Sequence, residues 1–159
     1  MNKEHKYKST VKWTGNSGLG TANYRAYSRD YTISAESKPD IPGSSDPSFL
    51  GDKDKYNPED MLVASLSACH MLWYLHLCAE AGIIVTDYID NAVGTMEVAE
   101  SGTGKFKVVA LNPTVAIRTK SLVDKAGQLH QRAHELCYIA RSVNFPVVHK
   151  PIIVVASEM

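Results

Sequence analysis

One long apolar stretch constrains the fold of this chain more than any other feature. Residues 58–81 read PEDMLVASLSACHMLWYLHLCAEA, with apolar side chains on nearly every side of a helical wheel. Asn57 stands at the N-cap, Pro58 at the first helical position and Gly82 just past the end, where these residue types are favoured. A helix that is apolar all round belongs in the interior of a protein. The sequence therefore predicts a long central helix covered on more than one side.

The residues before this helix predict strands and then a long loop. Residues 7–14, 21–27 and 31–35 alternate between apolar and polar types or follow turn residues, and we expect them to form a three-stranded meander. Residues 36–57 contain three prolines and several Ser and Asp residues, so they predict an irregular segment. A loop of this length in a compact domain is usually functional.

The residues after the helix predict a hairpin and a second helix. Residues 82–100 and 105–118 flank the turn SGTG and are expected to pair as a long hairpin. Ser121, with Asp124 three residues later, predicts the capping box of a helix over residues 122–140. The apolar residues of that segment fall on one face, so this helix is expected to lie on the sheet with its other side more solvated.

The order of these elements indicates the fold class. With residues 151–155 as a last strand, the chain reads βββ, helix, ββ, helix, β, which is typical of an α+β fold with few parallel crossovers. A length of 159 residues suits a single domain spanning residues 1–159, although an elongated α+β unit that completes itself by dimerising also falls within this range.

Charge and cysteine content limit which partners this protein can bind and in which cellular compartment we expect it. The chain has 17 Lys and Arg against 17 Asp and Glu, so it lacks the net positive charge on which nucleic-acid binding depends. The N-terminal sequence MNKEHKYKST has no apolar stretch after its charges, which predicts a cytoplasmic protein without a secretory signal. Three cysteines in a reducing compartment argue against a structural disulfide framework and leave reactive, metal-bound or inert thiols.

Helical geometry separates the cysteines. Cys69 and Cys78 are nine residues apart on one helix, which corresponds to about 13.5 Å of rise and roughly half a turn of rotation, so they point to opposite faces and cannot bond each other. If Cys69 has a redox partner, Cys137 is the cysteine outside its helix. All three thiols could equally be small apolar side chains in a core, where free cysteine most often lies.

Two further chemical interpretations depend on neighbouring side chains. His130, His134 and Cys137 fall at i, i+4 and i+7 of the second helix, which is a weak zinc pattern because histidines on a wet helix face are usually solvated.

A nucleophilic Cys69 must be ionised, and burial opposes ionisation. One guanidinium at about 4 Å, worth about 4 kcal/mol at an effective dielectric near 20, would outweigh moderate desolvation. Arg25, Arg29 or Arg141 could supply it.

Two segments resemble a known family. NPEDMLVASLSACHM, residues 57–71, resembles the NPE(E/Q)L…AxxxxC signature of the OsmC/Ohr family of organic hydroperoxide reductases, and AHELCYIARSVNFPV, residues 133–147, resembles that family's second-cysteine segment. The order of elements is also similar, so the resemblance covers nearly the whole chain. It implies an intertwined homodimer with two active sites at its interface.

The resemblance also implies a chemistry and its residues. Cys69 corresponds to the peroxidatic cysteine, whose thiolate attacks the O–O bond of an alkyl or fatty-acid hydroperoxide and becomes a sulfenic acid. Cys137 corresponds to the resolving cysteine, which condenses with that sulfenic acid to a disulfide that a dithiol, such as a lipoylated protein, then reduces. Glu59 corresponds to the acidic residue that orients an activating arginine. The implied enzyme needs no metal, flavin or haem.

The activating cation departs from the family pattern. Some relatives carry an arginine in an early Gly-Arg-Asp-Gly turn, where this chain reads GNSGLG, and others carry one shortly before NPE, where this chain offers Lys53 and Lys55. We expect Arg29 to take this role, and Arg25 after it. Glu59 and Cys69 would be about 15 Å apart on one straight helix, so the helix must bend near Ser65 or the dimer must bring one of them from the partner chain.

Four residues are expected to contact substrate. Phe49 and Leu50 on the long loop would form an apolar lip that favours apolar hydroperoxides. His70 either makes the pocket more polar or is a buried, hydrogen-bonded core histidine, which the usual behaviour of interior histidines favours. Trp73 follows Cys69 by one turn, although its helical spacing with Met71 and Tyr74 favours a position in the core. The missing family arginine keeps one alternative function open, a non-catalytic protein that binds a small apolar ligand on the same fold.

Overall fold

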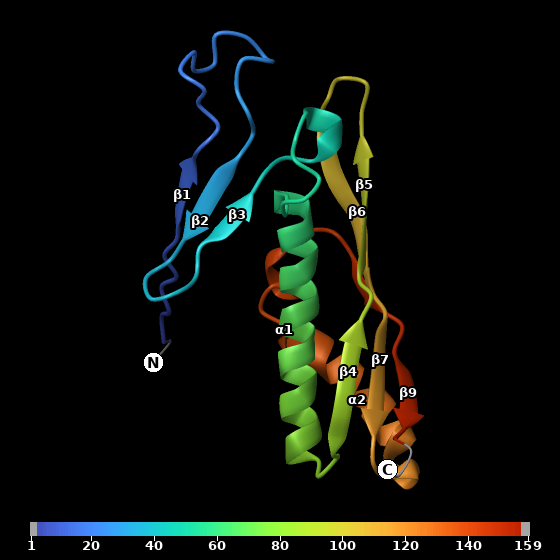
Figure 1. Ribbon diagram of the computed structural model, residues 1–159. Coiled ribbons are helices and arrows are strands. Elements are labelled where there is room, and N and C mark those ends of the chain that lie inside the picture. Colours follow the sequence, from blue (N-terminus) through green and yellow to red (C-terminus); the bar gives the residue numbers. More distant parts are fainter. Residues whose placement is uncertain (1–2, 157–159) are drawn as a thin grey trace. The chain divides into compact units, whose positions relative to one another are not determined.

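The computed structural model describes residues 3–156 (Figure 1). The chain divides into two compact units, residues 1–61 and residues 62–159. The first unit holds one three-stranded sheet, and the second holds two three-stranded sheets and two helices. The α+β class is confirmed, while the expectation of a single domain remains a prediction.

The first unit is built on an antiparallel sheet of β1 (Thr10–Trp13), β2 (Tyr31–Ser34) and β3 (Ile41–Gly43). Three strands were expected here, and the first and third of them are confirmed by β1 and β2, but the second, over residues 21–27, is wrong. Residues 21–27 are turns, in which the Asn23 side chain accepts a hydrogen bond from the Arg25 N–H at 2.9 Å instead of leaving the backbone to a ladder. The strand β3 comes from the expected loop, and its proline is tolerated because β3 is an edge strand.

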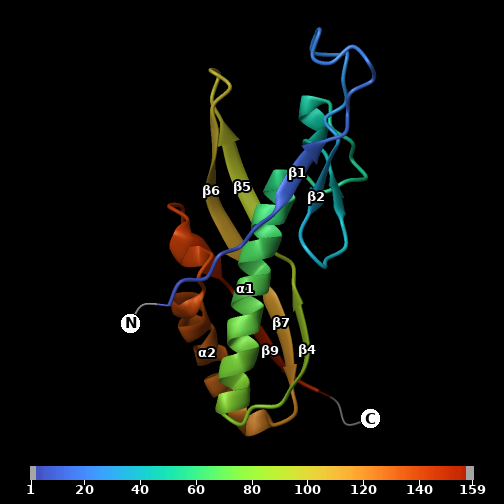
Figure 2. The ribbon, with the colours of Figure 1, turned by 90° about the vertical axis from the view of Figure 1, so that its left-hand side faces the viewer.

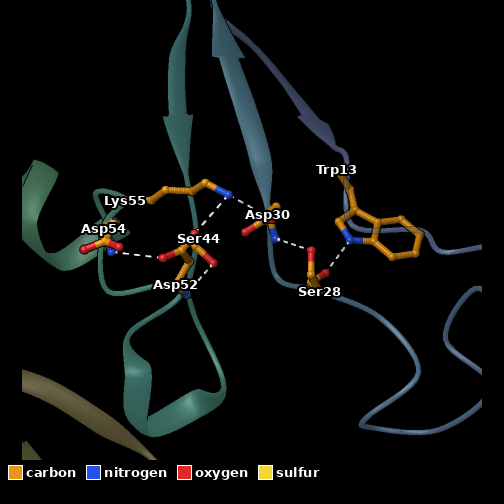
Figure 3. Close-up of polar contacts among 7 residues, drawn as sticks. All are labelled: Trp13, Ser28, Asp30, Ser44, Asp52, Asp54 and Lys55. Carbon is orange, nitrogen blue, oxygen red and sulfur yellow. Dashed lines mark hydrogen bonds and ion pairs between the residues drawn. The ribbon is translucent and has the colours of Figure 1, made fainter.

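Ion pairs and hydrogen bonds order the loop that follows β3 (Figure 3). The Lys55 ammonium lies 2.9 Å from a carboxylate oxygen of Asp30 and 3.2 Å from one of Asp52. The Asp30 N–H donates to the Ser28 hydroxyl at 3.4 Å, and the Trp13 indole N–H donates to the Ser28 carbonyl at 2.9 Å. The loop is therefore tied to the residues that lead into β2, and Lys55 is already paired.

The long helix α1 (Pro58–Glu80) begins and ends as expected. The Asn57 side chain accepts from the Asp60 N–H at 2.7 Å, and the Asp60 carboxylate accepts from the Asn57 N–H at 3.3 Å, which forms a reciprocal cap. Gly82 has a φ of +70°, and the Ile83 N–H donates to the Cys78 carbonyl at 2.8 Å. This left-handed glycine closes the helix in the manner of a Schellman motif.

The surface of α1 is less covered than expected. Its fully buried residues form one stripe, composed of Leu66, His70, Tyr74 and Cys78. The opposite stripe is exposed and consists of Ala64, Ala68, Leu72 and His76. The expectation of cover on more than one side is therefore wrong for the single chain, because an apolar helix face is left open to solvent.

After α1, the second unit contains the expected long hairpin, which is interrupted at its middle. It comprises β4 (Val85–Asp90), β5 (Val93–Val98), β6 (Gly104–Leu111) and β7 (Pro113–Ile117). The pairs β4–β7 and β5–β6 are both antiparallel but belong to different sheets. At the interruption, the Asp90 carboxylate accepts from the Asn112 N–H at 2.7 Å, so a side chain replaces the ladder there.

The C-terminal elements complete both sheets. The helix α2 (Val123–Leu136) follows the 3₁₀ turn η2 (Lys120–Leu122), and η3 (Ala140–Ser142) follows the helix. Ser121 lies inside η2, so the expected capping box at Ser121 is wrong and the helix is shorter than expected at both ends. β8 (Val147–His149) pairs parallel to β6, and β9 (Ile152–Val155) pairs parallel to β7.

Both helices cover one face of the sheet β4–β7–β9 (Figure 2). Their shared core contains buried residues from α1, the turn after it, β7 and α2, namely Tyr74, Cys78, Ile83, Val115, Ile117, Ala126 and Ala133. A second core joins Leu66 of α1 to Val109 and Leu111 of β6. α1 thus spans both cores, and Cys69 lies on it between Leu66 and Tyr74.

Candidate functional site

Two thiols from distant parts of the sequence meet in the second unit. Cys69 is half-buried in the middle of α1, and Cys137 is 1% exposed at the C-terminal end of α2. Cys69 is close enough to Cys137 to raise the pKa of its thiol, and both thiols are free. The structure therefore brings together the two cysteines that the sequence singled out.

The environment keeps Cys137 protonated. Burial, followed by the hydrogen bond with Cys69, raises the pKa of the Cys137 thiol to about 11, although the Ala140 N–H donates to its sulfur at 3.4 Å and opposes that shift. At neutral pH Cys137 is thus a protonated thiol, which can donate a hydrogen bond to its neighbour. Burial also raises the pKa of Cys78, which lies on the far side of α1 among core residues.

A carboxylate fixes the position of α1 close to Cys69. The Ser67 hydroxyl, two residues before Cys69, donates to the Asp90 carboxylate at 2.5 Å. The other oxygen of Asp90 accepts from the Asn112 N–H at 2.7 Å, at the interruption of the hairpin. This helical turn is therefore anchored to the point where the two sheets separate.

A buried pair of histidines links α1 to α2. The His70 Nε2 and His130 Nδ1 atoms are 2.9 Å apart, and the two rings are 1% and 0% exposed. Burial lowers the pKa of His70 to about 4 and that of His130 to about 3, so both are neutral at pH 7. The interpretation of His70 as a buried, hydrogen-bonded core histidine is confirmed, whereas the expectation of a solvated His130 is wrong.

Further polar side chains surround this pair. His149 of β8 stacks near both rings, with ring centroids 5.5 Å from His70 and 6.2 Å from His130, and His134 is 5.7 Å from His149. Tyr74 stacks on His130 at 3.8 Å. Within residues 3–156, no three His, Cys, Asp or Glu side chains are arranged to hold a metal ion, so the geometry does not support the zinc pattern on α2.

Two of the three cation candidates, Arg25 and Arg29, lie in the first unit, and the third, Arg141, lies in η3 of the second unit, four residues after Cys137. The Arg29 guanidinium donates to the carbonyls of Tyr27 at 2.6 Å and of Tyr24 at 2.5 Å, and it lies over both tyrosine rings at 4.3 and 4.2 Å. This side chain is thus bound within its own segment. Arg25 and Arg29 line one cavity of about 580 Å³.

The predicted lip residues share that region. Phe49 ends the 3₁₀ turn η1 (Pro47–Phe49), and its carbonyl accepts from the Tyr24 hydroxyl at 3.4 Å. Leu50 has a φ of +61° and lines the same cavity as Arg25 and Arg29. Phe49 and Leu50 are 52% and 42% exposed, and their role as a lip stays a prediction.

Trp73, four residues after Cys69, makes an aromatic contact with the residue that follows Cys137. Its ring packs edge-on against Tyr138, with centroids 5.6 Å apart, and Tyr138 directly follows Cys137. With Leu72 and His76, Trp73 lines a small cavity of about 280 Å³ on the outer side of α1. The structure therefore provides an apolar surface one helical turn from Cys69.

Glu59 and Cys69 remain apart within the chain. α1 is continuous from Pro58 to Glu80, and the Ser65 hydroxyl donates to the Leu62 carbonyl at 2.8 Å without breaking it. Ten residues of straight helix separate the two side chains by about 15 Å. Of the two explanations that the sequence left open, a bend or break near Ser65 is not observed.

Comparisons with known proteins identify the family. The family described as OsmC-like protein matches residues 51–151. A solved OsmC-like protein of unknown function from Vibrio cholerae is 30% identical, with 94% of this chain and 100% of that chain covered and a TM-score of 0.85. A search of curated proteins finds no match.

Two solved proteins with lower identity share the fold. An organic hydroperoxide resistance protein from Elizabethkingia anophelis, with thiocyanate bound, is 16% identical at a TM-score of 0.70, with 98% of this chain and 100% of that chain covered. An organic hydroperoxide resistance protein OsmC from Legionella pneumophila is 18% identical at a TM-score of 0.66, with coverages of 94% and 98%. The fold and the paired thiols thus define an OsmC-type α+β protein. This chain belongs to the OsmC-like family.

Proposed function

We propose that the protein is a thiol-dependent peroxidase that reduces alkyl or fatty-acid hydroperoxides to alcohols. The observation that carries this proposal is the neighbouring pair of free thiols, with Cys69 accessible from solvent and Cys137 buried and protonated beside it. A nucleophilic thiol next to a resolving thiol is what a reversible peroxidase requires. Solved proteins of the same fold are described as organic hydroperoxide resistance proteins.

The reaction has two steps on this chain. The Cys69 thiolate attacks the terminal oxygen of R–O–OH, the O–O bond breaks, and the leaving alkoxide takes a proton to become the alcohol. Cys69 is then a sulfenic acid, and the Cys137 sulfur displaces its hydroxyl as water to form the Cys69–Cys137 disulfide. A dithiol, such as a lipoylated protein, reduces the disulfide by exchange and returns both thiols.

The remaining residues are given supporting roles. Glu59 orients the activating cation and Arg29 supplies it, once the substrate or a partner chain draws the guanidinium away from its present carbonyls. Phe49, Leu50 and Trp73 contact the apolar part of the hydroperoxide, and His70 lies behind Cys69. The protein needs no metal, flavin or haem for these steps, because thiols carry all the electrons.

The protein is proposed to act as a homodimer in the cytoplasm. The exposed stripe Ala64, Ala68, Leu72 and His76 supports the dimer, because its small residues allow a second helix to approach α1 closely. A dimer would also permit Glu59 of one chain to serve Cys69 of the other. A reducing compartment suits three free cysteines.

The direct test is hydroperoxide consumption coupled to dihydrolipoamide. Cumene and linoleic hydroperoxides should both be turned over by the native protein and not by Cys69→Ser. Without added reductant, Cys137→Ser should consume about one equivalent per active site and stop at the Cys69 sulfenic acid, because no resolving thiol in the chain condenses with it. Undiminished turnover by Cys69→Ser would remove the mechanism. Cys78→Ser is the matched control and should retain turnover.

One observation favours a second candidate, a non-catalytic protein that binds a small apolar ligand. Arg29 is held by two carbonyls and two tyrosine rings, so a cation at Cys69 requires this arrangement to change. Alkylation of Cys69 by iodoacetamide as a function of pH separates the two functions. Rapid alkylation at about pH 6 favours the peroxidase, and alkylation only above about pH 8 favours the binder.

A further inference from the structure

The buried histidine pair crosses between the two helices that carry the thiols. His70 directly follows Cys69 on α1, and His130 precedes Cys137 by seven residues on α2. Seven residues are almost two full turns, so His130 and Cys137 lie on nearly the same face of α2. The Nε2 to Nδ1 distance of 2.9 Å therefore joins α1 and α2 on the side where their thiols meet.

The hydrogen bond between the two rings has a defined donor and acceptor and is shielded from water. Both rings are neutral, so one carries a proton on the shared side and the other offers a lone pair. The rings are nearly parallel at 12°, and Tyr74 covers His130 at 3.8 Å, which excludes water from the bond. A hydrogen bond without access to water is costly to break, because its two nitrogens would be left without partners.

We propose that the His70–His130 hydrogen bond is a clamp that holds α2 against α1 and positions Cys137 beside Cys69 for disulfide formation. The two histidines are thus positioning residues. Their use during turnover rests on the proposed function, but the clamp itself acts on any route to the disulfide. In the peroxidase cycle it serves the second step, in which the Cys137 thiol and the Cys69 sulfenic acid lose water and join their sulfurs.

The surroundings of Cys137 separate this role from direct proton transfer. Apart from the nitrogens that they share, the ring atoms of the pair, Nδ1 of His70 and Nε2 of His130, have no hydrogen-bond partner within residues 3–156, so neither ring is bonded to a thiol. The histidines therefore act through the helices that they join. The clamp should leave the first step, attack of Cys69 on the hydroperoxide, unchanged.

Substitutions that replace one specific nitrogen test the clamp. A glutamine amide reaches about as far as Nε2 of a histidine, and an asparagine amide about as far as Nδ1. His70 bonds through Nε2 and His130 through Nδ1, so His70→Gln and His130→Asn should keep the bond. His70→Asn and His130→Gln place the amide at the wrong depth and should lose it. Each pair differs by one methylene at one buried position, which makes the variants matched controls.

The readout is the stability of the Cys69–Cys137 disulfide in glutathione redox buffers, with the disulfide identified by mass spectrometry. The effective concentration of the two thiols should fall by roughly fivefold in His70→Asn and His130→Gln, the factor that one net hydrogen bond represents. It should fall by less than about twofold in His70→Gln and His130→Asn. Equal losses in kept and broken variants, or no loss in either, would overturn the clamp. If His70→Asn or His130→Gln does not fold, His70→Gln and His130→Asn still test the proposal. A fall of the effective concentration in both of these variants would refute a bond between these two nitrogens.

A second measurement distinguishes this proposal from the proposed function. In a Cys137→Ser background, the rate at which cumene hydroperoxide oxidises Cys69 should be the same with and without His130→Gln. A slower rate would show that the histidine pair acts on the first step and would overturn its positioning role. If cumene hydroperoxide oxidises Cys69 in no variant while the glutathione pattern holds, the peroxidase proposal fails and the clamp stands.

Discussion

Acidification should unfold this protein through its histidine pair. His70 and His130 face Tyr74 on α1, His134 on α2 and His149 on β8, and none of the groups that perturb their pKa values is a carboxylate. A free histidine has a pKa of about 6.5. Burial lowers the pKa of His70 to about 4 and that of His130 to about 3 in the folded state.

The sign follows from proton linkage. Between about pH 6.5 and the folded pKa values, the unfolded chain binds more protons than the folded chain, so falling pH favours unfolding. The stabilisation is complete above about pH 6.5 and is lost as the pH falls through that window. At 1.36 kcal/mol per pKa unit, lowering the pH from about 6.5 to about 4.5 should remove about 2 kcal/mol per histidine, or about 4 kcal/mol for the pair. This is a large part of the stability of a typical domain.

Urea unfolding at fixed protein concentration, followed by tryptophan fluorescence from pH 7.5 to 4.5, measures this loss. The carboxylates with lowered pKa values, such as Asp30 and Glu135, titrate below this range and contribute little. His70→Gln should reduce the loss by about half, whereas His5→Gln, at an exposed position outside every helix and strand, should leave it unchanged. A free energy of unfolding that changes by less than about 1 kcal/mol between pH 6.5 and 4.5 would refute the reasoning.

Three further predictions concern local features, each measured against the native protein. Gly82→Ala should lower the free energy of unfolding by about 1 kcal/mol, because alanine is strained at a φ of +70°; a neutral effect in urea would contradict the left-handed cap. Asn57→Ala should cost about 1 kcal/mol through loss of the reciprocal cap, and Asn57→Asp should recover it in the same assay. Cys137 and Cys78 should remain unmodified after brief iodoacetamide treatment at about pH 8, because burial raises the pKa of both thiols; mass spectrometric detection of either adduct would count against their burial.

The sequence was most informative where local chemistry decides the structure. The ends of α1 were predicted correctly because Asn57, Pro58 and Gly82 act on their immediate neighbours. The meeting of Cys69 with Cys137 followed from a resemblance rather than from spacing, since nothing local relates residues 68 positions apart.

Elements that depend on distant partners were missed. β3 and β8 are three residues long, and each exists because a longer strand beside it offers a free edge, which no local pattern reveals. His130 was misplaced because a histidine on a helix usually faces water. The available signal was its spacing from Ala126 and Ala133, at i−4 and i+3, which places it on the buried face.

Cys137 stands at the C-cap of α2, directly after its last residue, and this position determines which part of the chain would move if the thiol formed a disulfide. Its backbone has already left the helix, and only a short turn, η3, separates it from the chain that leads into β8. Drawing two sulfurs into a covalent bond would thus be accommodated by this brief connection, while the packed helices and sheets stay in place. A partner protein that binds only the disulfide form or only the dithiol form would have to contact η3 and the exposed Tyr138 ring beside it.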